Sequence, residues 1–430
     1  MVAQATATSS IDSYLAKFGL AAVGGFLFAT GFRVFPASSV SAIALVVTLV
    51  LYVGAFSSWT LALYLREPFS RWLQRGLAAA TAFGLIASVG YGILYEIPVY
   101  GTDVIALAHA GGEVLLDGIN PYSVSREEVS PILERMALQD GLMTQTLSGR
   151  AVDGVTYYPG LHVLAYTAFV GIGLQDLRWA TLVFELLALF AIWVVVSPRS
   201  RFLIPAVLLV EPYLMVTFTA GGVTDWLWVL PLTVCALLLH RGNYAWCGFW
   251  LGLACAVKQQ PWFAVPFVTM FVVLQTSRNS PSHSSARPMY TLALFLPMLG
   301  LGFLLPNLPF ILWSPRAWLQ GVIGPASLDL IPDGQGLVIL QNQGVLALSR
   351  AQFGILMVFV LIFLCLAYFA YFDRIKNLLW LLPSFVLFFA YRSLHTYFVF
   401  WLPIAAMWID LEFGSSEPER SPYPAKKPEG

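Results

Sequence analysis

Charged residues are scarce in this chain of 430 residues, at 11% of the sequence, and the two signs balance at 23 basic and 23 acidic side chains. Soluble globular domains carry about 25% charged residues, so the composition excludes an ordinary soluble protein. The zero formal net charge gives no indication of a nucleic-acid or acidic partner. In place of charge, 58% of the residues are hydrophobic and the mean hydropathy is +0.76. This composition predicts a polytopic membrane protein.

Cysteine is also rare, with four residues in the chain. Cys235, Cys247, Cys255 and Cys365 lie inside apolar runs, without the spacing of a metal site or a disulfide framework. We interpret them as small packing residues. Residues 1–16 lack the basic segment and the cleavage site of a signal peptide. We therefore expect them to form a cytoplasmic segment before a retained first span.

Apolar runs long enough to cross a bilayer recur along most of the chain. A helix needs about 20 apolar residues to span the hydrocarbon core. The pattern predicts an all-α protein with a single transmembrane domain over residues 17–412 and about twelve spans. The predicted spans are 17–34, 42–65, 77–97, 179–197, 203–219, 225–240, 244–258, 261–276, 289–312, 353–372, 378–391 and 396–411.

Two long polar stretches, 98–158 and 313–350, interrupt the spans, and their side of the membrane follows from the basic residues. Cytoplasmic ends are enriched in Lys and Arg. Fourteen of the 23 basic residues fall on one side if the apolar stretch 159–174 dips into the membrane without crossing it. They are Lys17, Arg66, Arg71, Arg75, Arg199, Arg201, Arg241, Arg278, Arg287, Arg374, Lys376, Arg420, Lys426 and Lys427. Both polar stretches are then extracytoplasmic loops with juxtamembrane helices, both termini are inside, and the tail 413–430 is expected to be disordered.

The first polar stretch carries a carboxylate where the third span ends. Asp103 begins an amphipathic segment whose apolar positions can form one face on the membrane. A carboxylate just outside the bilayer and beside apolar surface can act as a general base. The structural alternative is that Thr102 or Asp103 caps this segment as a helix.

Metal and nucleotide sites have no signature in the chain. His109, Glu113 and Asp117 follow one another at helical spacing, which could hold a metal but is more typical of a solvated stripe. No Asp-x-Asp, His-Glu-x-x-His or cysteine-pair motif occurs. No glycine-rich phosphate loop follows a strand, so we expect neither a metal nor a cofactor.

Charged residues at outer span ends are exceptions to the positive-inside pattern and therefore indicate function. Lys258 ends the seventh span, where an anionic lipid phosphate or simple snorkelling accounts for it. Arg392 and His395 are three residues apart, so they can share one helical face or tight loop and bind a phosphate. The alternative is that Arg392 and His395 lie among the aromatic residues of the membrane interface and bind no ligand. Asp225 begins the sixth span on the same side.

Together these residues resemble the GT-C superfamily of membrane glycosyltransferases, which use polyprenyl-phosphate sugars. The nearest type is the bacterial polyprenyl-phosphate-mannose-dependent mannosyltransferase. The resemblance covers about residues 77–411, and the chain has two spans before the aspartate-bearing loop where the family commonly has one. The elements that carry it are Asp103, Gly118-Ile-Asn-Pro-Tyr122, Tyr158-Pro159, Lys258 and the Arg392/His395 pair.

This resemblance implies a lipid-linked sugar donor, a lipid or glycan acceptor, and a cavity open to the outer leaflet of a bacterial plasma membrane. Asp103 would deprotonate the acceptor hydroxyl, which attacks the anomeric carbon with inversion. The residues implied to bind the departing phosphate are Lys258, Arg392 and His395. The residues implied to position the substrates are Asn120, Tyr122, Tyr158 and Asp225.

Two other classes of function stay open at this level. A transporter or flippase for lipid-linked or small polar cargo predicts ionisable residues within spans, and Glu185 and Glu211 fit it. A structural membrane scaffold predicts no clustered pocket at the outer ends.

Overall fold

The computed structural model describes residues 2–39, 41–64, 71–136, 143–198, 200–202, 212–278, 286–324 and 327–414. Within these ranges, seven helices are long and apolar enough to cross a membrane. The protein is therefore an all-α membrane protein. The seven helices are Tyr14–Ala37, Ala42–Tyr64, Arg71–Glu96, Arg178–Val195, Pro288–Trp313, Arg350–Ala370 and Thr396–Phe413.

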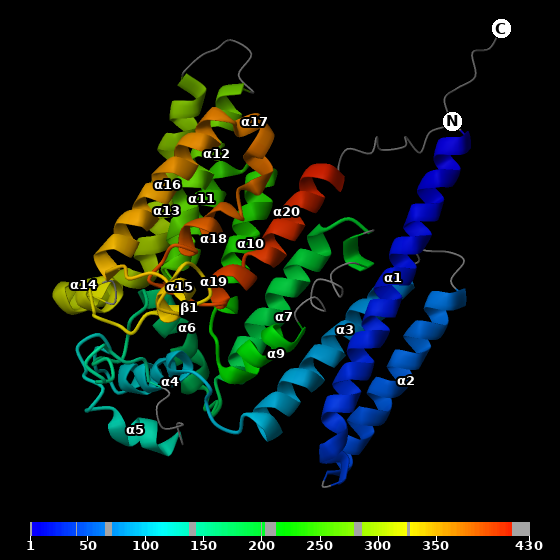
Figure 1. Cartoon of the computed structure of the whole chain (residues 1–430), viewed down its shortest axis with the longest axis horizontal. Coiled ribbons are helices and arrows are strands. Elements are labelled where there is room, and N and C mark those ends of the chain that lie inside the picture. Colours follow the sequence, from blue (N-terminus) through cyan, green and yellow to red (C-terminus); the bar gives the residue numbers. More distant parts are fainter. Residues whose placement is uncertain are drawn as a thin grey trace.

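The first three helices form a group at one side of the molecule (Figure 1), around a hydrophobic cluster that also includes Leu182 and Ala220. The group contains α1 (Val2–Val34), η1 (Phe35–Ser39), α2 (Ala42–Tyr64), α3 (Arg71–Tyr91) and the π-helical turn η2 (Gly92–Glu96). Helix α1 begins well before residue 17, because its first residues are rich in alanine, the strongest helix former. The segment 1–16 is thus largely an extension of the first helix.

The remaining long helices surround the larger hydrophobic core, which is rich in tryptophan. Trp226, Trp228, Trp380, Trp401 and Trp408 are fully buried there. The helices of this part are α7 (Arg178–Val195), α9 (Pro212–Gly221), α10 (Trp226–His240), α11 (Tyr244–Cys255), α12 (Val265–Arg278), α13 (Ala286–Trp313), α16 (Arg350–Ala370), α17 (Phe372–Ile375), α18 (Leu382–Leu387), α19 (Thr396–Val399) and α20 (Leu402–Gly414).

Local sequence explains two of the long helices. Ser349 and Gln352 form a reciprocal capping box, so α16 begins at Arg350 and continues through an apolar run to Ala370. Helix α13 continues through Pro297, Pro306 and Pro309. Prolines are tolerated in membrane helices because neighbouring groups satisfy the freed backbone positions.

Five of the twelve predicted spans do not correspond to helices of spanning length within the described residues. The spans at 225–240 and 244–258 are the short helices α10 and α11. The span at 261–276 is divided into a 3-10 turn, η4 (Gln260–Ala264), and α12, while 378–391 contains only the short helix α18 after η6 (Lys376–Leu378). Most of 203–219 lies outside the described residues. The prolines in these runs, such as Pro261 and Pro383, stand at the starts of the short elements and interrupt the apolar pattern.

Other predictions also fall outside the description. The tail 415–430 is one, and α20 extends as far as Gly414. Several charged residues named in the sequence analysis also lie outside the described residues. They are Arg66, Arg199, Glu211, Arg420, Lys426 and Lys427. The apolar stretch 159–174 contains α6 (Gly160–Gly171), which is shorter than a span.

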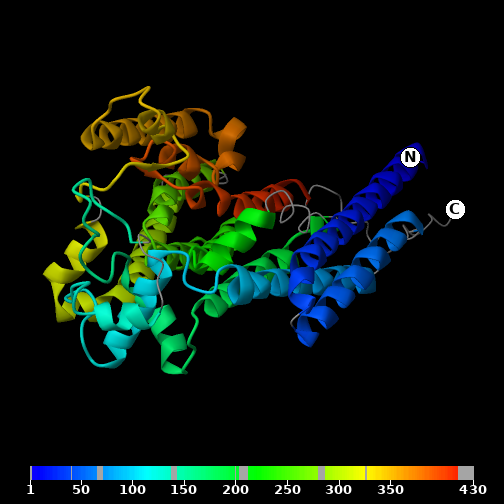
Figure 2. The ribbon, with the colours of Figure 1, turned by 60° about the horizontal axis from the view of Figure 1, so that its bottom comes forward.

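The two polar stretches meet at the same end of the molecule (Figure 1), and Figure 2 turns this end forward. They contain α4 (Asp103–Leu116), α5 (Ser130–Arg135), α14 (Pro315–Ile323), α15 (Val338–Asn342) and the short strand β1 (Asp333–Gly334). The stretches contact one another directly, since Thr146 bridges to Leu330 and the Leu147 amide donates to the Asp329 carbonyl at 2.7 Å. β1 pairs in parallel with β2 (Arg392–Ser393) from the end of the chain.

Candidate functional site

A cavity of about 930 Å³ lies at the end of the molecule where the two polar stretches meet. Segments from seven parts of the chain form its wall, so no single stretch of sequence defines it. Its charged side chains are three carboxylates and three cations. They are Asp103, Asp225, Asp329, Lys258, Arg350 and Arg392.

Asp103 stands in the cavity wall as the first residue of α4, and it is half-buried. Its Oδ2 accepts a hydrogen bond from the Thr144 amide at 2.9 Å. Neither of the two proposed caps operates, because α4 has no side-chain cap and the Thr102 hydroxyl instead donates to the Gly222 carbonyl at 2.9 Å. The Asp103 carboxylate therefore faces the cavity while one oxygen is fixed by the first polar stretch.

Lys258 and Asp225 form a buried ion pair in the same wall. The Lys258 ammonium lies 2.7 Å from Asp225 Oδ2 and 5.2 Å from the centre of the Tyr158 ring. The other carboxylate oxygen of Asp225 accepts a hydrogen bond from the Trp228 indole at 2.7 Å. Both oxygens of Asp225 are thus engaged, and the carboxylate holds Lys258 at the cavity edge.

Tyr158 links the charged groups of the cavity. Burial raises the pKa of its hydroxyl, the charges of Asp103 and Asp225 raise it further, and Arg392 acts in the opposite direction. Tyr158 and these three charged residues line the same cavity. Five of the residues singled out in the sequence for a site line this cavity: Asp103, Tyr158, Asp225, Lys258 and Arg392.

Arg392 reaches the cavity because a two-residue strand holds its backbone. In the parallel pair, Arg392 is opposite Asp333 and Ser393 is opposite Gly334. The Arg392 guanidinium also lies 3.9 Å from the Asp333 carboxylate. Gly334 has φ +132, and a Cβ there would lie 2.1 Å from the Ser393 carbonyl oxygen. The close pairing therefore requires glycine at this position.

Three residues predicted for the site do not line the cavity. His395 is exposed at the start of α19, because the chain turns after β2 and separates it from Arg392. Asn120 is buried, and its side-chain oxygen accepts a hydrogen bond from the Tyr122 amide at 3.1 Å. The Tyr122 hydroxyl donates to the Tyr158 carbonyl at 2.6 Å, so this pair supports Tyr158 from behind the wall.

Several polar residues of the cavity were not singled out for a site in the sequence, among them Arg350, Gln259 and His162. Arg350 donates to the Leu328 carbonyl at the edge of the cavity. Gln259 donates to the carbonyls of Tyr157 and Val322, at 2.8 and 2.9 Å. His162 is buried and contacts the Thr224 hydroxyl at 3.1 Å. Arg350 has a sequence signal, because it is a basic residue outside the group of fourteen assigned to the cytoplasmic side.

Part of the cavity wall is apolar. Trp262 and Phe263 come from η4, and Phe353 and Met357 come from the first turns of α16. The cavity thus joins a charged region to a surface suited to a hydrocarbon chain.

The second polar cluster singled out in the sequence lies at a different cavity, of about 550 Å³. His109 and Glu113 line it, with 3.5 Å between His109 Nε2 and Glu113 Oε1, and Arg135 pairs with Glu113 at 2.6 Å. Asp117 instead ends α4 and is exposed. Among the residues that the structure describes, no group of three His, Cys, Asp or Glu side chains is placed to hold a metal ion.

Comparisons with protein-family models, with curated proteins and with solved structures gave no match. The functional interpretation consequently depends on the geometry of the cavity and on the chemistry of its residues.

Proposed function

We propose that the protein is a membrane glycosyltransferase of the GT-C type, which transfers a sugar from a polyprenyl-phosphate donor to an acceptor hydroxyl. The observation that carries this proposal is that Asp103, Lys258 and Arg392 line one cavity whose wall is also partly apolar. Mannose as the sugar follows from the resemblance in sequence. The proposal includes about twelve spans, a bacterial plasma membrane, and an extracytoplasmic position for both polar stretches.

Asp103 is the general base of the proposed reaction. Its carboxylate takes the proton of the acceptor hydroxyl, and the acceptor oxygen attacks the anomeric carbon of the donor sugar. The bond between that carbon and the phosphate oxygen breaks, and the phosphate leaves with the electron pair. Attack from the face opposite the phosphate inverts the anomeric centre. The proton on Asp103 is then released to solvent.

Cations stabilise the charge that develops on the departing phosphate. Lys258 supplies an ammonium held by Asp225 at 2.7 Å, and Arg392 supplies a planar guanidinium that matches phosphate oxygens. Arg350 is a third cation in the same wall. Donors fixed before the reaction stabilise developing charge more effectively than mobile ones, because they need no reorganisation.

The apolar part of the cavity wall supports a lipid-linked donor over a soluble one. The isoprenoid chain would contact Trp262, Phe263 and Met357 while the sugar phosphate meets the charged residues. Burial of apolar surface contributes about 25 cal/mol per Å². Contact between the isoprenoid chain and these side chains would therefore anchor the donor in the cavity.

The test is the Asp103→Asn variant in membranes supplied with labelled polyprenyl-phosphate mannose. We expect sugar transfer to fall by about 10²–10⁴-fold, the usual contribution of a general base. Asp117→Asn is the matched control, because it changes an exposed carboxylate at the other end of α4. Transfer that is unchanged in Asp103→Asn would remove the proposed base.

A transporter for lipid-linked or small polar cargo is the second candidate, and Glu185 favours it. This carboxylate is fully buried in α7, where Oε2 accepts a hydrogen bond from Thr219 at 2.8 Å. Among the described residues, Oε1 has no hydrogen-bond partner. An ionisable group within a span is a typical mark of a transport path. Two results together would favour this candidate. The Glu185→Gln variant, reconstituted in vesicles, would no longer move cargo, and the unsubstituted protein would show no sugar transfer.

A further inference from the structure

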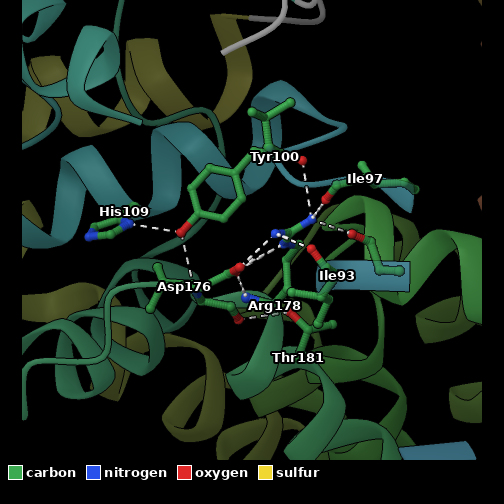
Figure 3. Close-up of polar contacts among 10 residues, drawn as sticks. Ile93, Ile97, Tyr100, His109, Asp176, Arg178 and Thr181 are labelled. Carbon is green, nitrogen blue, oxygen red and sulfur yellow. Dashed lines mark hydrogen bonds and ion pairs between the residues drawn. The ribbon is translucent and has the colours of Figure 1, made fainter. Parts of the chain in front are cut away.

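Arg178 is a buried cation that the proposed reaction does not use. It is the first residue of α7 and is 2% exposed. Its Nε and Nη2 donate to the Asp176 carboxylate at 2.9 and 2.6 Å, as Figure 3 shows. This carboxylate neutralises the guanidinium and fixes its plane, which leaves Nη1 directed at main-chain carbonyls.

The carbonyls that Arg178 binds belong to two segments far apart in the sequence. Nη1 donates to Ile97 and Val99, the latter at 3.1 Å, and to Ala220 at 2.9 Å. The first segment leads directly to Asp103, and the second leads directly to Asp225. One guanidinium therefore joins the two segments that carry carboxylates into the cavity.

The same two segments are joined by direct contacts beyond the guanidinium. The Gly101 amide donates to the Gly221 carbonyl at 2.9 Å, and the Thr102 hydroxyl donates to the Gly222 carbonyl at 2.9 Å. Gly222 has φ +95, and a Cβ there would lie 2.3 Å from Ile105 Cγ2. The segments thus remain in contact up to the last residue before Asp103.

Tyr100 extends this network into α4. The Arg178 guanidinium lies 5.5 Å from the centre of the Tyr100 ring. The Tyr100 hydroxyl accepts a hydrogen bond from the Leu177 amide at 3.0 Å and lies 2.9 Å from His109 Nδ1 (Figure 3). The start of α7 therefore contacts both the segment before Asp103 and the middle of the helix that Asp103 begins.

We propose that Arg178 is a positioning residue, which sets the distance between the base Asp103 and the Lys258–Asp225 pair by joining the segments 97–102 and 220–222. This role rests on the proposed function. A base and a phosphate-binding cation must be placed on opposite sides of the reacting carbon, and a displacement of about 1 Å can cost about 10²-fold in rate. Arg178 touches neither substrate in this role.

The experiment compares Arg178→Met and Arg178→Lys with Arg201→Met. Arg201 is a matched control, because it also donates to main-chain carbonyls of α7, those of Trp193 and Val194, at the opposite end of the helix. Hydrogen exchange is measured on peptides covering 97–103 and 219–225, and kcat and KM are measured with polyprenyl-phosphate mannose.

We expect Arg178→Met to raise exchange in both peptides at least tenfold and to lower kcat by about 10²-fold. The KM for the donor should stay within twofold, since Lys258, Arg350 and Arg392 are intact. Arg178→Lys, which keeps a cation but loses the planar fork, should recover part of kcat. Arg201→Met should leave both peptides and kcat unchanged.

The outcomes separate this proposal from the proposed function. Faster exchange in both peptides, with no sugar transfer in the unsubstituted protein, keeps the joining role of Arg178 and rejects the glycosyltransferase. Unchanged exchange in Arg178→Met rejects the joining role. Faster exchange with normal kcat rejects the positioning of Asp103. If Arg178→Met does not fold, the same readouts on Arg178→Lys decide, since an unchanged exchange there overturns the proposal.

Discussion

The ammonium of Lys258 and the carboxylate of Asp225 form an ion pair of 2.7 Å, in which the aspartate is fully buried and the lysine side chain is 8% exposed. The pair joins the segment between α11 and η4 to the start of α10, and the Trp228 indole donates to the second oxygen of Asp225. Both oxygens of Asp225 are thereby engaged, which makes Asp225 less suited than Asp103 to the proposed role of base.

The Lys258–Asp225 pair should show strong energetic coupling. Asp225→Asn leaves a buried ammonium without its counter-charge, so the free energy of unfolding should fall by about 3–5 kcal/mol. The double variant Asp225→Asn/Lys258→Met should be more stable than the sum of the two single changes predicts. Denaturant unfolding in detergent, followed by fluorescence, measures all four proteins. Simple additivity would contradict the coupling.

Stability should depend on pH through His109. Burial lowers the pKa of His109; the nearby charges of Glu113 and Asp176 raise it and that of Arg135 lowers it, with a net decrease. The unfolded state, with a histidine pKa of about 6.5, therefore binds the proton before the folded state does. The contribution of His109 to the free energy of unfolding is therefore complete above pH 6.5, and it is lost as the pH falls through 6.5 toward the folded-state pKa.

The melting temperature of the protein between pH 7.5 and pH 5 tests this linkage. His109→Gln should flatten the decrease, because glutamine keeps a hydrogen-bonding side chain and does not titrate. An equally steep decrease in His109→Gln would assign the pH dependence to other groups.

Gly334→Ala should weaken donor binding through the strand pair that holds Arg392. The added Cβ would lie 2.1 Å from the Ser393 carbonyl, so β1 and β2 must separate. We expect the donor KM to rise about tenfold, equivalent to about 1.4 kcal/mol. Gly344→Ala is the control, since Gly344 has φ +73 but open space around its Cβ position. It should cost about 1–2 kcal/mol of stability through backbone strain and leave KM unchanged.

Substitutions of Arg392 and His395 should have different effects, although the two residues are only three positions apart. Arg392→Gln removes a charged donor from the cavity, and hydrogen bonds to charged groups contribute about 1.5–3 kcal/mol, so the donor KM should rise by about 10–100-fold. His395→Gln should change KM by less than about twofold, because His395 is exposed and outside the cavity. Equal effects of the two substitutions on the donor KM, in a steady-state transfer assay, would contradict this prediction and indicate that His395 also contacts the donor.

Charges at the ends of apolar runs are conspicuous in a sequence that is 11% charged. Asp103, Asp225, Lys258 and Arg392 could be chosen for this reason alone, because a membrane protein rarely retains such residues without a partner or a ligand. Arg350 has the same mark in the sequence, because it is a basic residue at the end of an apolar run and outside the cytoplasmic group. His162 could not be identified from the sequence, because a histidine inside an apolar run has no local feature that distinguishes a cavity residue from a packed one.

The sequence by itself determined the all-α membrane class, because helix length and hydropathy are properties of contiguous residues. It did not determine where short helices replace full spans, since the packing of neighbouring segments decides how much backbone can end inside the protein. Nor could it determine that Asp225 is the partner of Lys258, that His395 turns away from Arg392, or that Arg178 joins the segments before Asp103 and Asp225. These relationships are contacts between residues distant in the chain, and the tertiary packing of the helices alone brings them together.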